Sequence, residues 1–220
     1  MARSNRDGIH PAASIEPHAG SGHPFARLLC ALRHQLWRFR NRIGRLRVLL
    51  AAPRHGRCAE IGVWKGDFSH RILQLRKPAE LHLIDPWLFA SHFPDRWYGG
   101  AVARSQADMD AIAQSVVCRF AGSPEVVIHR TSSLDAAARF SESYFDWIYI
   151  DGDHSYQSVL DDLRTWYSKL RSGGYIALDD YEWRDEHNTT SVRSAINTFL
   201  ANNTVAAATV MQGQFLIRKA

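Results

Sequence analysis

The chain has 220 residues, of which 45% are hydrophobic and 22% are charged, and it contains only three cysteines. This composition is typical of a globular domain, and the few, widely spaced cysteines exclude a disulfide-stapled scaffold and argue against a thiol zinc site. The net charge of +5 is unevenly divided, because residues 1–57 hold eleven arginines and two acidic residues (+9) and the remainder carries −4. The basic charge therefore describes one end of the chain and does not indicate a specific nucleic-acid partner. The unpaired cysteines favour a reducing, cytoplasmic compartment.

The first fifty residues fall into two segments of different character. Residues 1–24 are rich in Gly, Pro, Ser, Ala and His, which predicts a disordered tail. Residues 25–52 predict a basic amphipathic helix that ends before Pro53. Its apolar residues alternate spacings of four and three and form a heptad seam: Phe25, Leu29, Leu32, Leu36, Phe39, Ile43, Leu46 and Leu50.

Three roles for this helix follow from its charge. A free coiled coil is disfavoured because arginines surround the seam without acidic partners, and because Gly44 weakens the middle of the helix. An anionic membrane surface would suit the basic face. The mildly acidic body suits it equally well, so we expect the seam to pack on the folded body of the same chain or of a neighbouring copy.

From residue 57 onward the pattern alternates between strands and helices. Strands are predicted at 57–61, 80–85, 125–131, 145–151 and 175–180, and helices at 67–76, 101–120, from Ser133, at 156–170 and at 192–200. Two further strands joined near Gly213 end the sequence. Residues 57–220 therefore predict one α/β domain, a doubly wound and mostly parallel seven-stranded sheet with a C-terminal hairpin, preceded by the Arg-rich helix.

Polar residues follow the first two predicted strands, where ligands bind in such sheets. The first strand runs into a glycine turn, Glu60-Ile-Gly62-Val-Trp-Lys-Gly66, in which the backbone could approach a ligand closely. Asp85 ends the second strand, where an acid that binds both ribose hydroxyls would lie. The pair favours an adenosine-containing cofactor, and the absence of a three-glycine fingerprint argues against NAD.

Carboxylates also end the fourth and fifth strands. Asp151-Gly-Asp153-His154 follows one, and Asp179-Asp180 follows the other. Neighbouring strands would bring these carboxylates together, and a hard divalent cation such as Mg²⁺ would offset their repulsion. In the ordinary alternative, the aspartates cap a loop or face solvent. His154 beside them could accept a proton near neutral pH.

These blocks resemble the class I S-adenosylmethionine-dependent methyltransferases, and within them the metal-dependent O-methyltransferases of the macrocin type. The resemblance rests on EIGVWKG, LIDPW, YIDGDHSY and GGYIALDDY, and it covers about residues 57–182. It implies S-adenosylmethionine and Mg²⁺ as cofactors and a small-molecule hydroxyl (of a sugar, diol or phenol) as acceptor. Amino-terminal helices in such enzymes often cover the substrate site or form a dimer, so we also expect a homo-oligomer.

The resemblance also implies roles for individual residues. The cofactor would contact Glu60, Gly62, Val63, Trp64, Gly66, Asp85, Ser132, Ser133 and Asp151. The metal ligands would be Asp151, Asp179 and Asp180. His154 would be the general base, with Asp153 as the fallback. The loop at 86–100, where the acceptor would be selected, carries no diagnostic motif.

Other readings of the same residues stay open. Asp151-Gly-Asp153 is a D-x-D pattern, as in metal-dependent glycosyltransferases that use nucleotide sugars, although the glycine turn and Asp85 argue against that class. A related bacterial branch described as hydroxylases would share the metal triad. A catalytically inactive binding module that works through its Arg-rich helix is disfavoured by the intact strand-end carboxylates.

Overall fold

The computed structural model describes residues 24–184 and 188–220. The tail predicted for residues 1–24 lies, apart from Pro24, outside the described residues. The helices are α1 (Pro24–Leu50), α2 (Asp67–Arg76), η1 (Trp97–Ala101), α3 (Gln106–Phe120), α4 (Ser133–Ala137), α5 (Tyr156–Lys169) and α6 (Ser191–Asn202). The strands are β1 (Arg57–Ile61), β2 (Glu80–Ile84), β3 (Val126–His129), β4 (Phe145–Ile150), β5 (Leu170–Leu178), β6 (Val205–Met211) and β7 (Gln214–Lys219).

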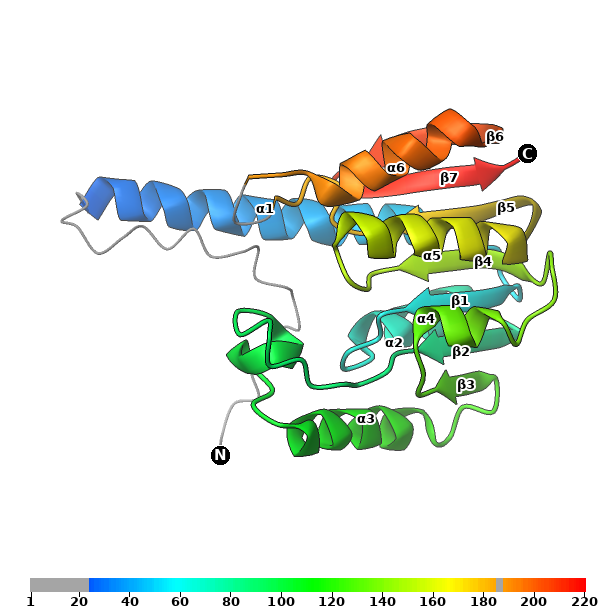
Figure 1. The fold of residues 1–220 in the computed structure, drawn as a ribbon, viewed down its shortest axis with the longest axis horizontal. Helices are drawn as coiled ribbons and strands as arrows, with labels where there is room; N and C mark the ends of the chain where they lie inside the picture. The colour runs from blue at the N-terminus through cyan, green and yellow to red at the C-terminus, as the bar shows by residue number, and fades with distance from the viewer. Residues whose placement is uncertain (1–23, 185–187) are drawn as a thin grey trace.

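All seven strands form one sheet in the order β3-β2-β1-β4-β5-β7-β6 (Figure 1). The first five strands are parallel, and β7 runs antiparallel to both of its neighbours, β5 and β6. The predicted α/β sheet with a C-terminal hairpin is confirmed. Strand order reverses between β1 and β4, so their carboxyl ends flank the crevice in which such sheets bind ligands.

Hydrophobic side chains pack on both faces of the sheet. One cluster lies under α4, α5 and α6 and includes Trp166 and Phe199. The other lies under α2, α3 and the end of α1 and includes Trp147 and Met109. Strands covered on both faces are nearly continuous hydrophobic runs, which is why β4 reads FDWIYI and has no simple alternation.

The helix predicted for residues 101–120 begins later in the structure. Residues Trp97–Ala101 form a separate turn of π-helix, in which Gly100 has a φ of 156°. The main helix starts after Ser105, whose hydroxyl accepts a hydrogen bond from the backbone N–H of Asp108 at 3.2 Å. Apolar periodicity alone did not reveal this cap.

The carboxyl-terminal end of α1 packs on the body, and its amino-terminal part extends beyond the sheet (Figure 1). In the part of α1 whose side chains are described, the heptad seam does not make this contact with the body of its own chain, so that half of the expectation is wrong, and packing of the seam on a neighbouring copy stays a prediction. Leu36 and Leu50 of the seam are 62% and 70% exposed, whereas Asn41, Val48 and Leu49, on another face, are buried. Heptad spacing identified an apolar stripe without identifying which face of the helix the body would cover.

Gly44 explains why this other face packs inward. A Cβ atom at Gly44 would lie 2.4 Å from the carbonyl oxygen of Gln212 and 2.7 Å from that of Met211. These backbone atoms cannot move aside as a flexible side chain could, so only glycine permits this approach. Gly44 therefore brings α1 against the β6–β7 turn and sets the position of the next residue, Arg45.

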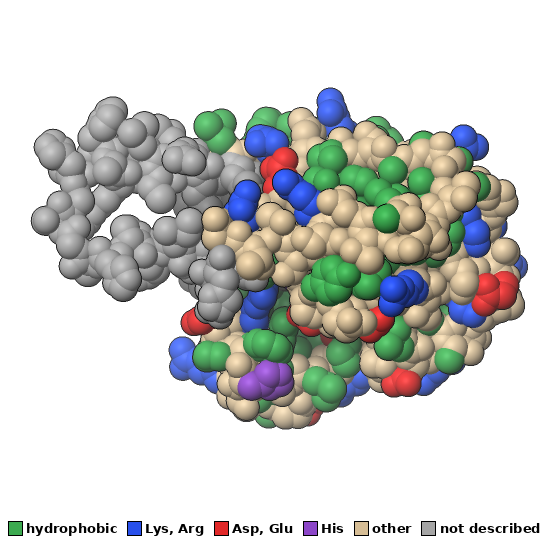
Figure 2. Space-filling view, turned by 45° about the horizontal axis from the view of Figure 1, so that its top comes forward, with side chains coloured by type: hydrophobic (Ala, Val, Ile, Leu, Met, Phe, Trp, Pro, Cys, Tyr) green, Lys and Arg blue, Asp and Glu red, His purple; other side chains and the backbone are tan. Residues whose placement is uncertain are grey.

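No helix in the described part of the chain is long and apolar enough to cross a membrane. On the face shown in Figure 2, the Lys and Arg side chains drawn in colour are scattered among acidic and apolar ones and do not gather into one basic patch.

Candidate active site

The glycine turn after β1 lies directly against the end of β4. Gly62 has a φ of +86°, and a Cβ atom there would lie 2.0 Å from the carbonyl oxygen of Asp151. Gly66 also has a positive φ and precedes the first turn of α2. The two glycines thus bend the chain closely around the carboxyl ends of β1 and β4.

Asp85 fastens this turn to the end of β2. Its carboxylate accepts backbone hydrogen bonds from Val63 at 3.0 Å, Trp64 at 2.9 Å and Trp87 at 2.7 Å. Burial raises the pKa of Asp85, and these three hydrogen bonds oppose the rise. Oδ1 accepts only the bond from Trp87 among them, so it retains a lone pair for a ligand hydroxyl.

Glu60 is buried beneath the turn. Its carboxyl group accepts a hydrogen bond from the Ser69 hydroxyl at 2.5 Å. Burial raises the pKa of Glu60 to about 8, even though the Ser69 bond and the nearby Arg45 favour the charged form.

The raised pKa makes Glu60 a source of pH-dependent stability. The folded protein binds a proton at Glu60 from the ordinary pKa of 4.5 up to about 8, where the unfolded chain has released it. The free energy of unfolding should therefore fall as the pH rises through this window, by at most about 1.4 kcal/mol per pH unit from this group. Urea unfolding of the wild type and Glu60→Gln at pH 5, 6, 7 and 8 would isolate this slope. An identical slope in both proteins would assign it to another group.

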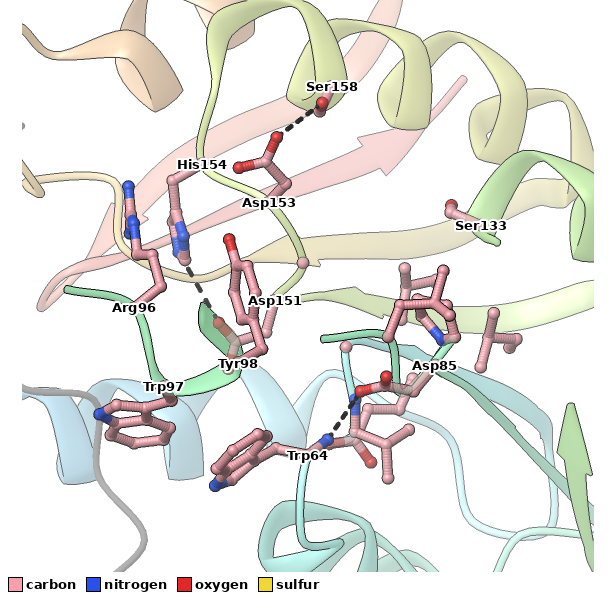
Figure 3. Close-up of a pocket in the computed structure, with 18 of the residues that line it drawn as sticks. Trp64, Asp85, Arg96, Trp97, Tyr98, Ser133, Asp151, Asp153, His154 and Ser158 are labelled. Atoms are coloured by element: carbon pink, nitrogen blue, oxygen red, sulfur yellow. Dashed lines mark hydrogen bonds and ion pairs between the residues drawn. The ribbon is translucent and has the colours of Figure 1, made fainter. Parts of the chain in front are cut away.

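A pocket of about 520 Å³ connects these residues with the ends of β3 and β4. Its lining includes the turn from Gly62 to Trp64, Asp85, Ser132 and Ser133, and the segment 151–154 (Figure 3). The volume is within the usual range for small-molecule and cofactor sites. The structure therefore brings together all the predicted cofactor-binding residues except Gly66, which lies at the start of α2 and does not line the pocket.

The two predicted serines also have structural roles. Ser132 caps α4, because its hydroxyl accepts from the Asp135 backbone N–H at 3.2 Å. The Ser133 hydroxyl donates to Asp162 at 2.5 Å and accepts from Trp166 at 2.7 Å. Burial raises the pKa of Asp162 to about 6. Their predicted contact with adenine stays a prediction.

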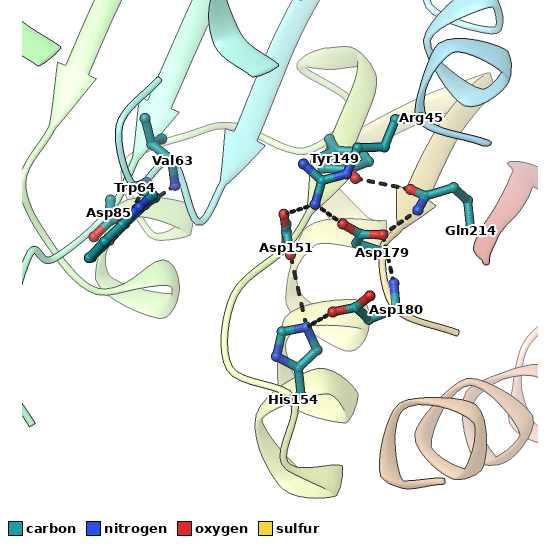
Figure 4. A network of polar contacts seen from close by, with 10 residues as sticks. All are labelled: Arg45, Val63, Trp64, Asp85, Tyr149, Asp151, His154, Asp179, Asp180 and Gln214. Atoms are coloured by element: carbon teal, nitrogen blue, oxygen red, sulfur yellow. Dashed lines mark hydrogen bonds and ion pairs between the residues drawn. The ribbon is translucent and has the colours of Figure 1, made fainter. Parts of the chain in front are cut away.

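Asp151, Asp179 and Asp180 converge at the ends of β4 and β5, together with an arginine from α1 (Figure 4). Arg45 Nη2 donates to Asp151 Oδ2 at 2.8 Å and also contacts Asp179 Oδ2. Burial and the charge of Asp179 raise the pKa of Asp151 well above its ordinary value, and Arg45 opposes the rise. The structure brings the three predicted carboxylates together, and the cation beside them is Arg45, which sequence analysis did not identify.

Both carboxylate oxygens of Asp179 have hydrogen-bond partners. Oδ1 accepts from the Gln214 side-chain amide and from the Asp180 backbone N–H at 2.8 Å. Gln214 in turn accepts a hydrogen bond from the Tyr149 hydroxyl at 2.9 Å. All three side chains in this chain of hydrogen bonds are buried.

The predicted magnesium triad does not fit this arrangement. Arg45 binds two of its three members, Asp151 and Asp179, and Asp179 has further donors on its other oxygen. A different set, Asp151, His154 and Asp180, has ligand atoms within 4.8 Å of one another. That set replaces a carboxylate by an imidazole, which Mg²⁺ accepts poorly.

His154 is buried beside Asp151 and Asp180. Its Nε2 lies 3.1 Å from Asp180 Oδ2 and 3.9 Å from Asp151 Oδ1, and the residue lines the pocket. The fallback base, Asp153, is less suitable, because its carboxylate accepts from the hydroxyls of Ser155 and Ser158, both at 2.9 Å. Burial raises the pKa of Asp153, but these bonds outweigh it and leave the pKa below its ordinary value.

Residues 59–181 match a family described as a methyltransferase domain. The matched stretch is more than half of the chain, and it includes β1 to β5 with all the strand-end residues described above. The chain belongs to this family of methyltransferases. Its fold is the Rossmann-like methyltransferase fold with a seven-stranded, mostly parallel sheet.

Known proteins resemble this chain to different degrees. An uncharacterised protein of Acanthamoeba polyphaga mimivirus is 40% identical over 146 residues, which are 65% of this chain and 58% of the viral protein. A candidate S-adenosyl-L-methionine-dependent methyltransferase from Methanococcus maripaludis is 16% identical with a TM-score of 0.56, covering 92% of this chain and 97% of its own. A protein of Corynebacterium glutamicum is 19% identical with a TM-score of 0.55, covering 80% of each chain. These two structures share the fold.

The segment between β2 and α3 forms a wall of the pocket that sequence analysis did not resolve. Arg96, Trp97 and Tyr98 all line the pocket, and Figure 3 shows Arg96 and Tyr98 next to His154 and Trp97 next to Trp64. Trp97 lies against Trp64 with ring centroids 5.5 Å apart, and Arg96 lies 4.7 Å from the Trp183 ring centroid. The aromatic residues between 86 and 100 were the available signal, but nothing in their spacing specified this arrangement.

Proposed function

We propose that the protein transfers a methyl group from S-adenosylmethionine to a hydroxyl group of a small molecule. The observation that carries the proposal is one pocket that joins the Asp85-fastened glycine turn to His154. The turn offers a site for a nucleoside-containing cofactor, and His154 offers a base for an acceptor.

The residues of the pocket would have separate roles in binding the cofactor and in removing the proton of the acceptor. Bound S-adenosylmethionine would supply an electrophilic methyl group on a sulfonium sulfur. Asp85 Oδ1 would accept a hydrogen bond from the ribose, and Gly62 would let that ligand approach the backbone. His154 Nε2 would take the hydroxyl proton while the acceptor oxygen bonds to the methyl carbon and the carbon–sulfur electron pair stays on sulfur. Asp180 would stabilise the resulting imidazolium from 3.1 Å away.

The walls of the pocket favour an acceptor that carries a ring. Trp64, Trp97 and Tyr98 line the same pocket as His154 and offer aromatic faces on which a sugar or a phenol could pack. A nucleotide-sugar glycosyltransferase is disfavoured, because Asp153 of the D-x-D pattern is engaged by two serines and because of the family match. The magnesium-assisted form of methyl transfer is the alternative within this proposal, and it would require Arg45 to release Asp151 and Asp179.

Calorimetric titration with S-adenosylmethionine and S-adenosylhomocysteine tests the cofactor site. Asp85→Ala should weaken binding by about 10- to 100-fold, because a charged hydrogen bond to the ribose and the anchor of the turn are lost together. Asp110→Ala is the control, since Asp110 lies on α3 outside the pocket. Absence of binding to the wild type, or unchanged affinity in Asp85→Ala, would overturn the assignment. Cofactor consumption with sugars, diols and catechols would then identify the acceptor class.

A further inference from the structure

Arg45 reaches the acidic cluster from outside the domain that the family describes. It belongs to α1, whereas its partners Asp151 and Asp179 follow β4 and β5, 106 and 134 residues later in the chain. Its side chain is only 18% exposed. The contact is therefore a long-range, largely buried ion pair that the catalytic domain cannot form by itself.

The surroundings of Arg45 suit a guanidinium group. The guanidinium carbon lies 5.7 Å from the ring centroid of Phe68 and 6.0 Å from that of Tyr149, which are cation–π distances. Nη2 of this group contacts two carboxylates at once, and a guanidinium is more weakly hydrated than a lysine ammonium and keeps its charge when it is buried. Gly44, the residue before it, permits the close packing of α1 that brings the side chain this far inward.

Arg45 stands where a cation is needed for the reaction. It lines the pocket together with Asp151 and His154, so its positive charge faces the space in which the acceptor would bind. A fixed cation at that position stabilises the negative charge that develops on an acceptor oxygen as its proton leaves. A divalent metal ion would supply the same stabilisation, but Arg45 holds Asp151 and Asp179 of the predicted triad, and Asp151 also belongs to the alternative set with His154 and Asp180.

We propose that Arg45 replaces the divalent cation at this site, so that α1 completes the active site and methyl transfer proceeds without a metal. The inference rests on the proposed methyl transfer only for its effect on catalysis. The exclusion of metal ions by Arg45 is a property of the folded protein and can be measured without turnover.

The first experiment measures metal binding without turnover. Mn²⁺ titrations of full-length protein, followed by the electron paramagnetic resonance signal of free Mn²⁺, should show no site in the wild type below about 1 mM. Arg45→Ala should gain a site that is at least tenfold tighter and is lost again in the double variant Arg45→Ala/Asp151→Asn. Arg47→Ala is the matched control, because Arg47 is exposed on the same turn of α1. Tight Mn²⁺ binding to the wild type that Asp151→Asn removes would overturn the proposal.

The second experiment measures turnover. Wild-type methyl transfer should be unchanged in EDTA, and Arg45→Ala should lose about 10²-fold in kcat, with partial recovery on adding guanidinium ions or Mn²⁺. If Arg45→Ala does not fold, Arg45→Lys should remain resistant to EDTA with a smaller loss. Wild-type turnover that EDTA abolishes and Mg²⁺ restores would contradict the inference. If the wild type does not bind S-adenosylmethionine at all, the proposed function fails, and the Mn²⁺ titration still decides the role of Arg45.

Discussion

Replacing His154 with alanine is expected to lower kcat for methyl transfer by about 10²–10⁴-fold and to leave the affinity for S-adenosylmethionine nearly unchanged. The imidazole lies 3.1 Å from Asp180 and lines the side of the pocket proposed for the acceptor, whereas the glycine turn and Asp85, proposed to bind the cofactor, lie at the ends of β1 and β2. Removing the ring therefore removes the group that accepts the hydroxyl proton and leaves the cofactor contacts in place.

Steady-state kinetics and calorimetry on the same preparations separate these two effects. His70→Ala is the control, because His70 is an exposed histidine on α2. A loss of less than about threefold in kcat would show that His154 is not the base and only packs against its neighbours. Equal losses in kcat and in cofactor affinity would show instead that the substitution disturbs the whole pocket.

Asp179→Ala is expected to destabilise the fold by about 3–5 kcal/mol, because it leaves the Arg45 cation buried with one of its two described carboxylate partners missing. The side-chain amide of Gln214 would lose its acceptor at the same time. Asp179→Asn keeps an acceptor but removes the charge, so its loss should be smaller. The measurement is the free energy of unfolding in urea.

An exposed ion pair provides the comparison for this substitution. Asp110 pairs with Arg130, and both side chains are about half exposed. Asp110→Ala should cost much less than Asp179→Ala, because solvent screens such pairs. If Asp179→Ala costs no more than Asp110→Ala, the buried network does not contribute to stability as its geometry implies.

The strands and their polar ends could be predicted because both are local properties of the chain. Uninterrupted runs such as FDWIYI identify strands buried on both faces, and the residue that follows each run lies at one edge of a parallel sheet. Asp85, Asp151 and Asp179 could therefore be placed at the site before their neighbours were known. The family resemblance added the cofactor, and the match to methyltransferase domains supports that part.

The positive charge that faces the carboxylates could not be predicted, because it comes from a residue far from them in the sequence. Arg45 is one of eleven arginines in residues 1–57, and nothing in its sequence neighbourhood separates it from the others. The apolar seam predicted that a different face of the same helix would pack on the body. That seam is largely exposed where its side chains are described. Only the approach at Gly44 shows which face of α1 turns inward.

The ribosome synthesises α1 before β4, β5 and β7. The contacts of Arg45 therefore also bear on the order in which parts of the protein fold. Its two carboxylate partners leave the ribosome 106 and 134 residues later, and the Gln214 that completes the network later still. Contacts of such wide sequence separation form late and slow the folding of a domain. The acidic pocket is therefore expected to close last, after the sheet is built, when α1 docks onto β6 and β7.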